Sequence, residues 1–176
     1  LTVSLVDGAG ANSSNTTVTI EPSSITIVGD AEIVDDINTL SLGTIDLSSF
    51  TSNYTKEMPI ILPDGVSSQS GVTSATVNIS IVGLDTIQVT SSNFQITDET
   101  DGYSADLLTE SLNVTVRGPA SRLSDITSQN VRIVVSLDGI GNSEGMFAVE
   151  PRIYIDGVSG VGAVGDYEVN VRVSKS

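Results

Sequence analysis

The chain repeats one unit of sequence, and this repeat limits the possible folds more than any other feature. Three matches between the halves occur in the same order: residues 25–29 (ITIVG) with 114–118 (VTVRG), 64–66 (DGV) with 156–158 (DGV), and 77–81 (VNISI) with 169–173 (VNVRV). The offset drifts only from 89 to 92 residues. A unit used twice predicts two similar domains in tandem, and we place them at residues 1–83 and 84–176.

The residue composition favours β-structure in both units. Val and Ile together number 39, whereas Leu and Ala together number 20. Side chains branched at Cβ are stiff and pack well on a pleated sheet, and alternating apolar residues have the period of a strand. We therefore expect an all-β fold of twisted, mostly antiparallel strands. In the first unit the expected strands are residues 17–20, 24–28, 42–45, 58–62 and 76–82.

One short helix is expected after the glycine of each unit. In the first unit Asp30 is a candidate N-cap, because its carboxylate can accept hydrogen bonds from first-turn N–H groups. In the second unit Pro119 or Ser121 begins the equivalent helix. The side chains expected on one side are Ile33, Val34 and Ile37 of the first helix and Leu123 and Ile126 of the second.

The two units differ where they begin. The second unit opens with strand-like runs over residues 85–89 and 93–96, whereas the first has only residues 1–5 before a polar loop. We therefore expect that the first unit lacks its opening strand.

Several classes of function are excluded by residue types that the chain lacks. It has no Cys and no His, so neither thiolate nor imidazole can bind zinc or copper. Ser-His-Asp and Cys-His catalysis also lack their base. The net charge is −15, from 22 acidic and 7 basic residues, which argues against nucleic acid as a partner. No apolar run reaches the length of about 18 residues that a membrane helix needs.

Two acidic features have a functional interpretation and a structural one. Residues 98–102 (DETDG) could bind calcium through oxygen ligands near a glycine, but they lack the spacing of an EF-hand, and an acidic turn is favoured. Asp35 and Asp36 could form a carboxylate pair for acid–base chemistry. Adjacent residues on a helix point to different sides, so a structural role is favoured there too.

The second unit contains a glycine-rich stretch and most of the positive charge. Residues 157–165 (GVSGVGAVG) resemble a phosphate-binding loop, but they lack its Lys and Ser/Thr, and a flexible hairpin loop is favoured. The arginines could form weak cross-strand ion pairs at the surface or bind an acidic partner; they are Arg117, Arg122, Arg132, Arg152 and Arg172. We assign no catalytic, cofactor-binding or metal-ligating residue.

The order of these motifs resembles that of YbbR-like domains. The first unit carries the family pattern in residues 20–51, 58–66 and 75–83. The positions that fit are Pro22, Ser23, Ser24, Ile25, Gly29, Ile37, Ile45, Asp46, Leu47, Leu62, Pro63, Asp64, Gly65, Val66, Val77 and Ile79. In the second unit they are Gly102, Tyr103, residues 113–126, Ser136, Leu137, Asp156, Gly157, Val158, Val169 and Val171. The second unit departs from the pattern at Glu110-Ser111, in place of Pro-Ser, and at Ile155, in place of the turn proline.

The resemblance implies a function that no composition or spacing shows. YbbR-like domains occur in tandem outside the membrane, behind one N-terminal membrane helix, and CdaR-type regulators of a membrane diadenylate cyclase have this form. It implies a non-enzymatic, extracytoplasmic module, held at the cell membrane only by an anchor absent from this chain. Its expected partner is the cyclase or another envelope protein, with no cofactor. The alternative is a cell-surface adhesin or spacer of tandem β domains.

Overall fold

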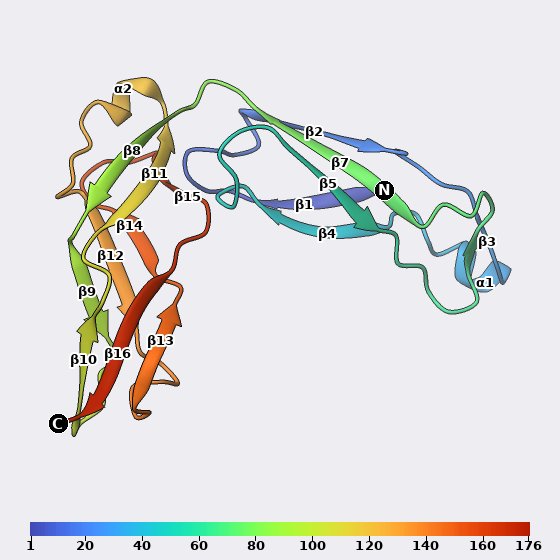
Figure 1. Cartoon of the computed structure of the whole chain (residues 1–176). Helices are drawn as coiled ribbons and strands as arrows, with labels where there is room; N and C mark the ends of the chain where they lie inside the picture. The colour runs from blue at the N-terminus through green and yellow to red at the C-terminus, as the bar shows by residue number, and fades with distance from the viewer. The chain divides into compact units, whose positions relative to one another are not determined.

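The structure is a computed structural model that describes residues 1–176, and it divides into two compact units. We call Leu1–Gly83 unit 1 and Leu84–Ser176 unit 2 (Figure 1). Each unit consists of short strands and one four-residue helix. No helix has the length and apolar character required to cross a bilayer.

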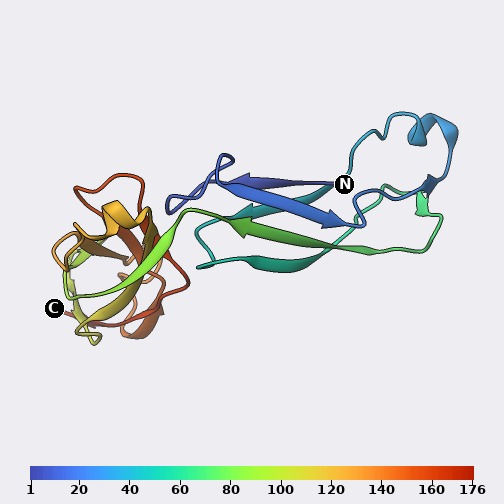
Figure 2. The same ribbon diagram turned by 90° about the horizontal axis from the view of Figure 1, so that it is seen from above.

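Unit 1 is built on two main sheets. Its elements are β1 (Thr2–Val6), β2 (Thr16–Glu21), β3 (Ile27–Val28), α1 (Ala31–Val34), β4 (Ser41–Asp46), β5 (Tyr54–Pro59), β6 (Ser67–Ser68) and β7 (Ser74–Ile81). Strands β2, β7 and β5 form an antiparallel sheet with β7 in the centre, and β1 pairs parallel to β4. The two sheets form layers, which overlap when viewed from above (Figure 2). Leu42 and Ile45 of β4 and Val77 and Ile79 of β7 are buried in its core.

The helix and the shortest strands of unit 1 lie together at one end of the unit. Figures 1 and 2 both show α1 and β3 beyond the ends of β2 and β7. There β3 pairs with β6. Asp30 caps α1, because its Oδ1 accepts a hydrogen bond of 3.1 Å from the Glu32 amide. No side chain of the helix is fully buried. Of the three residues expected on one side, Val34 and Ile37 are half-buried and Ile33 is 39% exposed.

Unit 2 has three sheets of three strands around one core. Its elements are β8 (Asp85–Ser91), β9 (Phe94–Thr97), β10 (Tyr103–Leu107), β11 (Leu112–Gly118), α2 (Ala120–Leu123), β12 (Val131–Ser136), β13 (Gly145–Val149), β14 (Arg152–Ile155), β15 (Gly162–Val164) and β16 (Val169–Lys175). The strand orders are β10-β16-β13, β15-β11-β8 and β14-β12-β9. Val116, Ile133 and Val171, one from each central strand, are fully buried in the same cluster. Leu123 and Ile126, expected to face inward, belong to it as well.

The sheets of the two units correspond strand by strand, and this gives the two units a common plan. The sheet β2-β7-β5 corresponds to β10-β16-β13, the parallel pair β1-β4 corresponds to β9-β12, and the pair β3-β6 corresponds to β11-β15. Unit 2 has two further strands, β8 beside β11 and β14 beside β12. Unit 1 has no strand at either place.

The predicted fold class is confirmed, with local corrections. The strand expected at residues 24–28 is reduced to β3, two residues long, and the strand expected at 58–62 lies earlier, as β5. The hairpin loop expected at 157–165 contains a strand, because β15 pairs with β11. The Pro63–Gly65 turn forms as expected, with Gly65 at φ +82°. The first residues of unit 1 form β1, the counterpart of β9, so the opening strand that has a place in unit 2 and none in unit 1 is β8.

Candidate functional site

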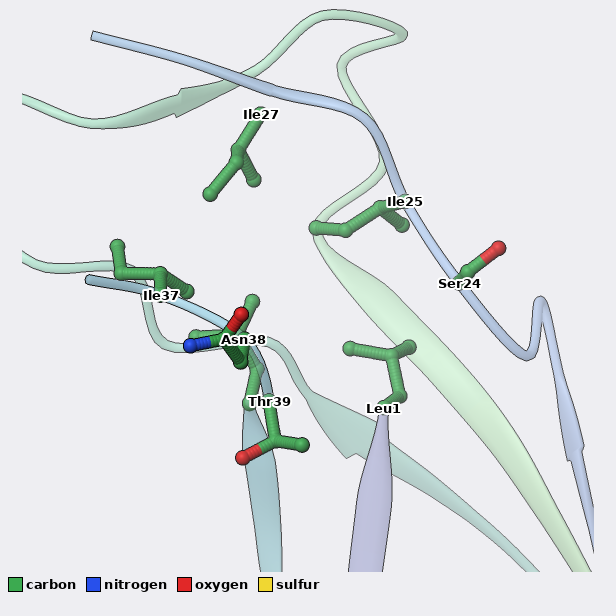
Figure 3. A pocket seen from close by; sticks show the side chains of 8 residues that line it. Leu1, Ser24, Ile25, Ile27, Ile37, Asn38 and Thr39 are labelled. Carbon is green, nitrogen blue, oxygen red and sulfur yellow. The ribbon is translucent and has the colours of Figure 1, made fainter. Parts of the chain in front are cut away.

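A small groove lies at the end of unit 1 that carries α1 and β3. We call it the Leu1 groove. It is lined by Leu1, Ser24, Ile25, Ile27, Ile37, Asn38, Thr39 and Leu40, and its cavity volume is about 130 Å³. Figure 3 shows the side chains of Leu1, Ile25 and Ile37 directed toward a shared space, whereas Ser24 points away from it. The floor of the groove is therefore aliphatic.

The local sequence explains why these aliphatic side chains meet. Residues 24–28 are extended, so Ile25 and Ile27 point to one side and the exposed Thr26 to the other. The opposite wall follows α1: the Ile37 amide donates to the Val34 carbonyl at 3.1 Å and closes a turn. This turn brings Ile37 across from the extended segment.

The first two residues form hydrogen bonds to both walls of the groove. The Leu1 ammonium donates to the carbonyl of Ser23 at 2.9 Å, on the wall formed by the extended segment. The Thr2 amide donates to the carbonyl of Leu40 at 2.9 Å, on the other wall. The start of β1 thus lies where the walls converge.

The corresponding place in unit 2 is filled by a strand. By the repeat offset, Ile25, Ile27 and Ile37 of unit 1 correspond to Val114, Val116 and Ile126 of unit 2. The unit 2 residues are buried, with exposures of 0%, 0% and 9%, whereas their unit 1 counterparts are only half-buried. In unit 2, Val89 of β8 is buried in the same cluster and Ile87 packs against it. The Leu1 groove is therefore the space that β8 covers in the other unit.

The chemistry of the groove suits binding rather than catalysis. Apart from the ammonium of Leu1, no lining group is ionisable: the polar groups are the hydroxyls of Ser24 and Thr39 and the amide of Asn38. General acid–base catalysis needs a group that can exchange a proton near neutral pH. An aliphatic floor beside a backbone edge can instead bind an extended peptide.

The acidic loop at residues 98–102 is organised by hydrogen bonds from hydroxyl groups. Asp98 adopts φ +61°, and its Oδ2 accepts hydrogen bonds from the hydroxyls of Ser136 and Thr97. These two bonds, the Ser136 bond first, lower the pKa of the Asp98 carboxyl. No group of three or more Asp, Glu, His or Cys in the structure is arranged to hold a metal ion. The hydroxyl donors give this loop a structural explanation.

The structure supports neither acid–base chemistry at Asp35 and Asp36 nor phosphate binding by the glycine-rich stretch. Asp35 and Asp36 are exposed, and Asp35 ends α1 with its amide donating to the Ala31 carbonyl. The glycine-rich stretch contains β15, and no helix follows it. A phosphate loop needs the N-terminus of a helix behind it, so this stretch does not have that architecture.

The arginines fall into different environments. Arg132 forms an ion pair with Asp156, with contacts of 2.7 Å from Nε to Oδ2 and 3.1 Å from Nη2 to Oδ1. Its guanidinium also lies 4.7 Å from the centre of the Tyr154 ring, on the neighbouring strand. The hydrogen bond lowers the pKa of Asp156 and raises that of Arg132. Arg117 is 1% exposed, so the prediction that it lies at the surface is wrong.

The comparison with known families identifies the first unit. Residues 1–81 match the sequence model of a family described as YbbR-like protein. Unit 1 matches the YbbR-like family. The YbbR-like match covers unit 1, and a second YbbR-like domain at residues 84–176 stays a prediction from the repeat. A search of curated protein sequences found no match.

Two solved structures of YbbR-like proteins are similar to this chain at low sequence identity. One is the YbbR-like domain of a Listeria monocytogenes protein, at 20% identity and a TM-score of 0.39, covering 52% of this chain and 95% of that one. The other is a YbbR-like protein from Streptococcus pneumoniae, at 13% identity and a TM-score of 0.37, covering 99% of this chain and 91% of that one.

The sequence alone does not predict the Leu1 groove. It places Ile25 and Ile27 in an expected strand and Ile37 on one side of an expected helix. A signal was nevertheless present, because unit 2 has strand-like residues 85–91 that unit 1 lacks. A strand without its neighbour leaves the apolar residues of the next strand uncovered.

Proposed function

We propose that this chain is a non-enzymatic, extracytoplasmic module of a membrane-anchored YbbR/CdaR-type protein. In this proposal it regulates a membrane diadenylate cyclase, and thus cyclic di-AMP synthesis, through protein–protein contact. The single observation that carries the proposal is the match of residues 1–81 to the YbbR-like family. The membrane anchor, the cellular location and the cyclase partner come from what the family resemblance implies.

The side-chain chemistry supports a binding role over catalysis. The sequence has no His and no Cys, and the Leu1 groove is lined by aliphatic, hydroxyl and amide groups. The carboxylate of Asp98 is engaged by two hydroxyl donors. A regulator that acts by contact needs stable surfaces and no reacting group, and short paired strands around aliphatic cores supply such surfaces.

A second candidate function is a spacer or adhesin at the cell surface. The tandem repeat favours it, because a spacer needs folded units that can be repeated and no reacting group. The two candidates differ in one consequence: a spacer leaves the activity of a cyclase unchanged, whereas a regulator changes it.

The experiment measures cyclic di-AMP in cells that co-express a membrane diadenylate cyclase with the full-length parent protein. A parent lacking residues 1–176 is compared at equal expression. We expect the parent to change the cyclic di-AMP level and the deletion to abolish that change. A cyclase variant without activity is the control that sets the background. An unchanged level with both forms contradicts the regulatory proposal and favours the spacer.

A further inference from the structure

The end of unit 1 that carries α1 presents aliphatic side chains to solvent. Val28 of β3 is 44% exposed, and Ile33 of α1 is 39% exposed. Three segments meet there around Gly29, because a Cβ on Gly29 would lie 2.7 Å from the Gly65 carbonyl oxygen and 3.3 Å from Val34 Cγ2. The half-buried Val34 therefore packs toward Gly29, and the rest of the short helix faces solvent (Figure 1).

Acidic side chains adjoin these aliphatic ones, and no basic side chain lies among them. Asp30, Glu32, Asp35 and Asp36 are exposed, and none of them forms an ion pair. The only Lys or Arg of unit 1 is Lys56, which lies in β5. Carboxylates so close in sequence repel one another, and an approaching cation relieves part of that repulsion. We call this surface the α1 face, and its members are Val28, Asp30, Glu32, Ile33, Asp35 and Asp36.

The corresponding helix of unit 2 has neither feature. By the repeat offset of 89, residues 30–36 (DAEIVDD) correspond to residues 119–125 (PASRLSD). The first segment has four acidic residues and no basic one, whereas the second has one of each, Asp125 and Arg122. Arg122 stands in the place of Ile33. Both helices have four residues and follow a glycine, so the fold itself requires neither the charge nor the exposed isoleucine of α1.

We propose that the α1 face docks a basic surface of a protein partner, on which Lys or Arg side chains flank an aliphatic or aromatic anchor. The carboxylates pair with the basic groups, and the anchor covers Ile33 and Val28. Charge complementarity selects this occupant, because an anionic phospholipid surface, a nucleic acid or a second copy of this chain, with its net charge of −15, is repelled. The inference rests on the proposed binding role and adds the chemistry of the partner.

The charged and the aliphatic parts of the α1 face contribute in different ways. Exposed ion pairs add little affinity each, but they speed the encounter and orient the partner. Salt screens this contribution. Burial of Ile33 and Val28 supplies the part of the affinity that salt does not screen. Binding at the α1 face should therefore weaken with salt without disappearing.

The test titrates the isotope-labelled whole chain with a synthetic peptide, KLKKLLKKLK, and follows the amide chemical shifts. A second peptide, KSKKSSKKSK, keeps the charge and lacks the apolar side chains. We expect the largest shifts at residues 28–36 and none of comparable size at residues 119–125. The serine peptide should bind about threefold more weakly or less tightly still, because it cannot cover Ile33 and Val28.

Matched variants separate the α1 face from the overall charge. Glu32→Ser with Asp35→Ser introduces the residues of unit 2, whereas Glu110→Ser with Glu144→Ser removes the same charge at exposed sites of unit 2. We expect the first pair to raise the Kd of KLKKLLKKLK by about fivefold or more, and the second pair by less than about twofold. Ile33→Ser should weaken binding of KLKKLLKKLK and leave that of KSKKSSKKSK unchanged.

Three results would overturn the proposal. These are the absence of saturable shifts at residues 28–36, equal weakening by the two pairs of variants, and no effect of Ile33→Ser on KLKKLLKKLK. Binding of phosphatidylglycerol vesicles through the same residues would overturn it as well, because the occupant would then be a membrane. The cyclic di-AMP experiment decides the regulatory role independently, since it uses neither peptide.

Discussion

At the scale of single residues, two glycines of the repeat have the same physical explanation. A Cβ on Gly29 would lie 2.7 Å from the Gly65 carbonyl oxygen, and a Cβ on Gly118 would overlap Val161 Cγ1. In both units a loop crosses directly over the glycine, and no other residue leaves room for it. The glycines recur because the units share this close crossing.

We predict that Gly29→Ala destabilises unit 1 by about 1 to 3 kcal/mol, the usual cost of forcing atoms into an occupied space. The backbone of the Gly65 loop must shift, because a carbonyl oxygen cannot rotate away as a side chain can. Amide exchange of the unit 1 core strand β7 measures the change. Thr26→Ala, an exposed site nearby, is the control. Equal amide exchange of β7 in the two variants would contradict the prediction, because it would show that the Gly65 loop leaves room for a Cβ at position 29.

Asp98 carries the second prediction at residue scale, a dependence on pH. Its pKa is lowered first by the hydrogen bond from Ser136. A carboxyl group with a lowered folded-state pKa stabilises the fold above its unfolded-state pKa, and this stabilisation is lost as pH falls through the folded-state pKa. Ser136→Ala should therefore raise the pKa of Asp98 toward its ordinary value. Carboxyl carbon NMR titration measures the pKa directly, with Ser174→Ala as a remote control; no change on Ser136→Ala contradicts the assignment.

At the scale of secondary-structure elements, similar sequences do not give strands of equal length. The runs ITIVG and VTVRG have the same alternation, but the first contains the two-residue β3 and the second belongs to the seven-residue β11. The difference lies in the neighbour, because β8 pairs along the whole of β11. The missing counterpart of β14 has a local reason as well, since Pro63 stands where Ile155 pairs with Val131, and proline has no N–H to donate.

The neighbouring strand also determines how much stability is lost when corresponding residues of the two units are replaced by alanine. Val116 is fully buried, whereas its counterpart Ile27 is half-buried. We predict that Val116→Ala destabilises unit 2 by about 2 kcal/mol through lost burial and a cavity. Ile27→Ala removes more atoms but should cost unit 1 less than about 1 kcal/mol, because much of that surface is already in water. Amide exchange in the core strands β16 and β7 measures both costs; a larger cost for Ile27→Ala contradicts the comparison.

At the scale of the whole molecule, the sequence predicts the parts that depend on local pattern. Alternation predicts the strands, Asp30 predicts the cap of α1, and Pro63–Gly65 predicts a turn. The pairing between distant strands is not local, so the parallel pairs β1-β4 and β9-β12 were not predicted. The Leu1 groove is missed for the same reason, because it exists only where a neighbouring strand is absent.

The core of unit 2 leads to a prediction about the whole molecule. All twelve buried residues of its cluster, from Val89 to Val173, lie within residues 84–176, and three sheets contribute to it. A domain with its own core folds independently. We therefore predict that the fragment of residues 84–176 alone has the same free energy of unfolding as unit 2 in the whole chain, to within about 1 kcal/mol.

The fragment of residues 1–83 should unfold at a lower denaturant concentration than the fragment of residues 84–176, because the Leu1 groove leaves aliphatic surface in water. Denaturant unfolding of each fragment, with amide exchange of the whole chain as reference, measures this; a fragment 84–176 that does not fold would show that its core needs unit 1.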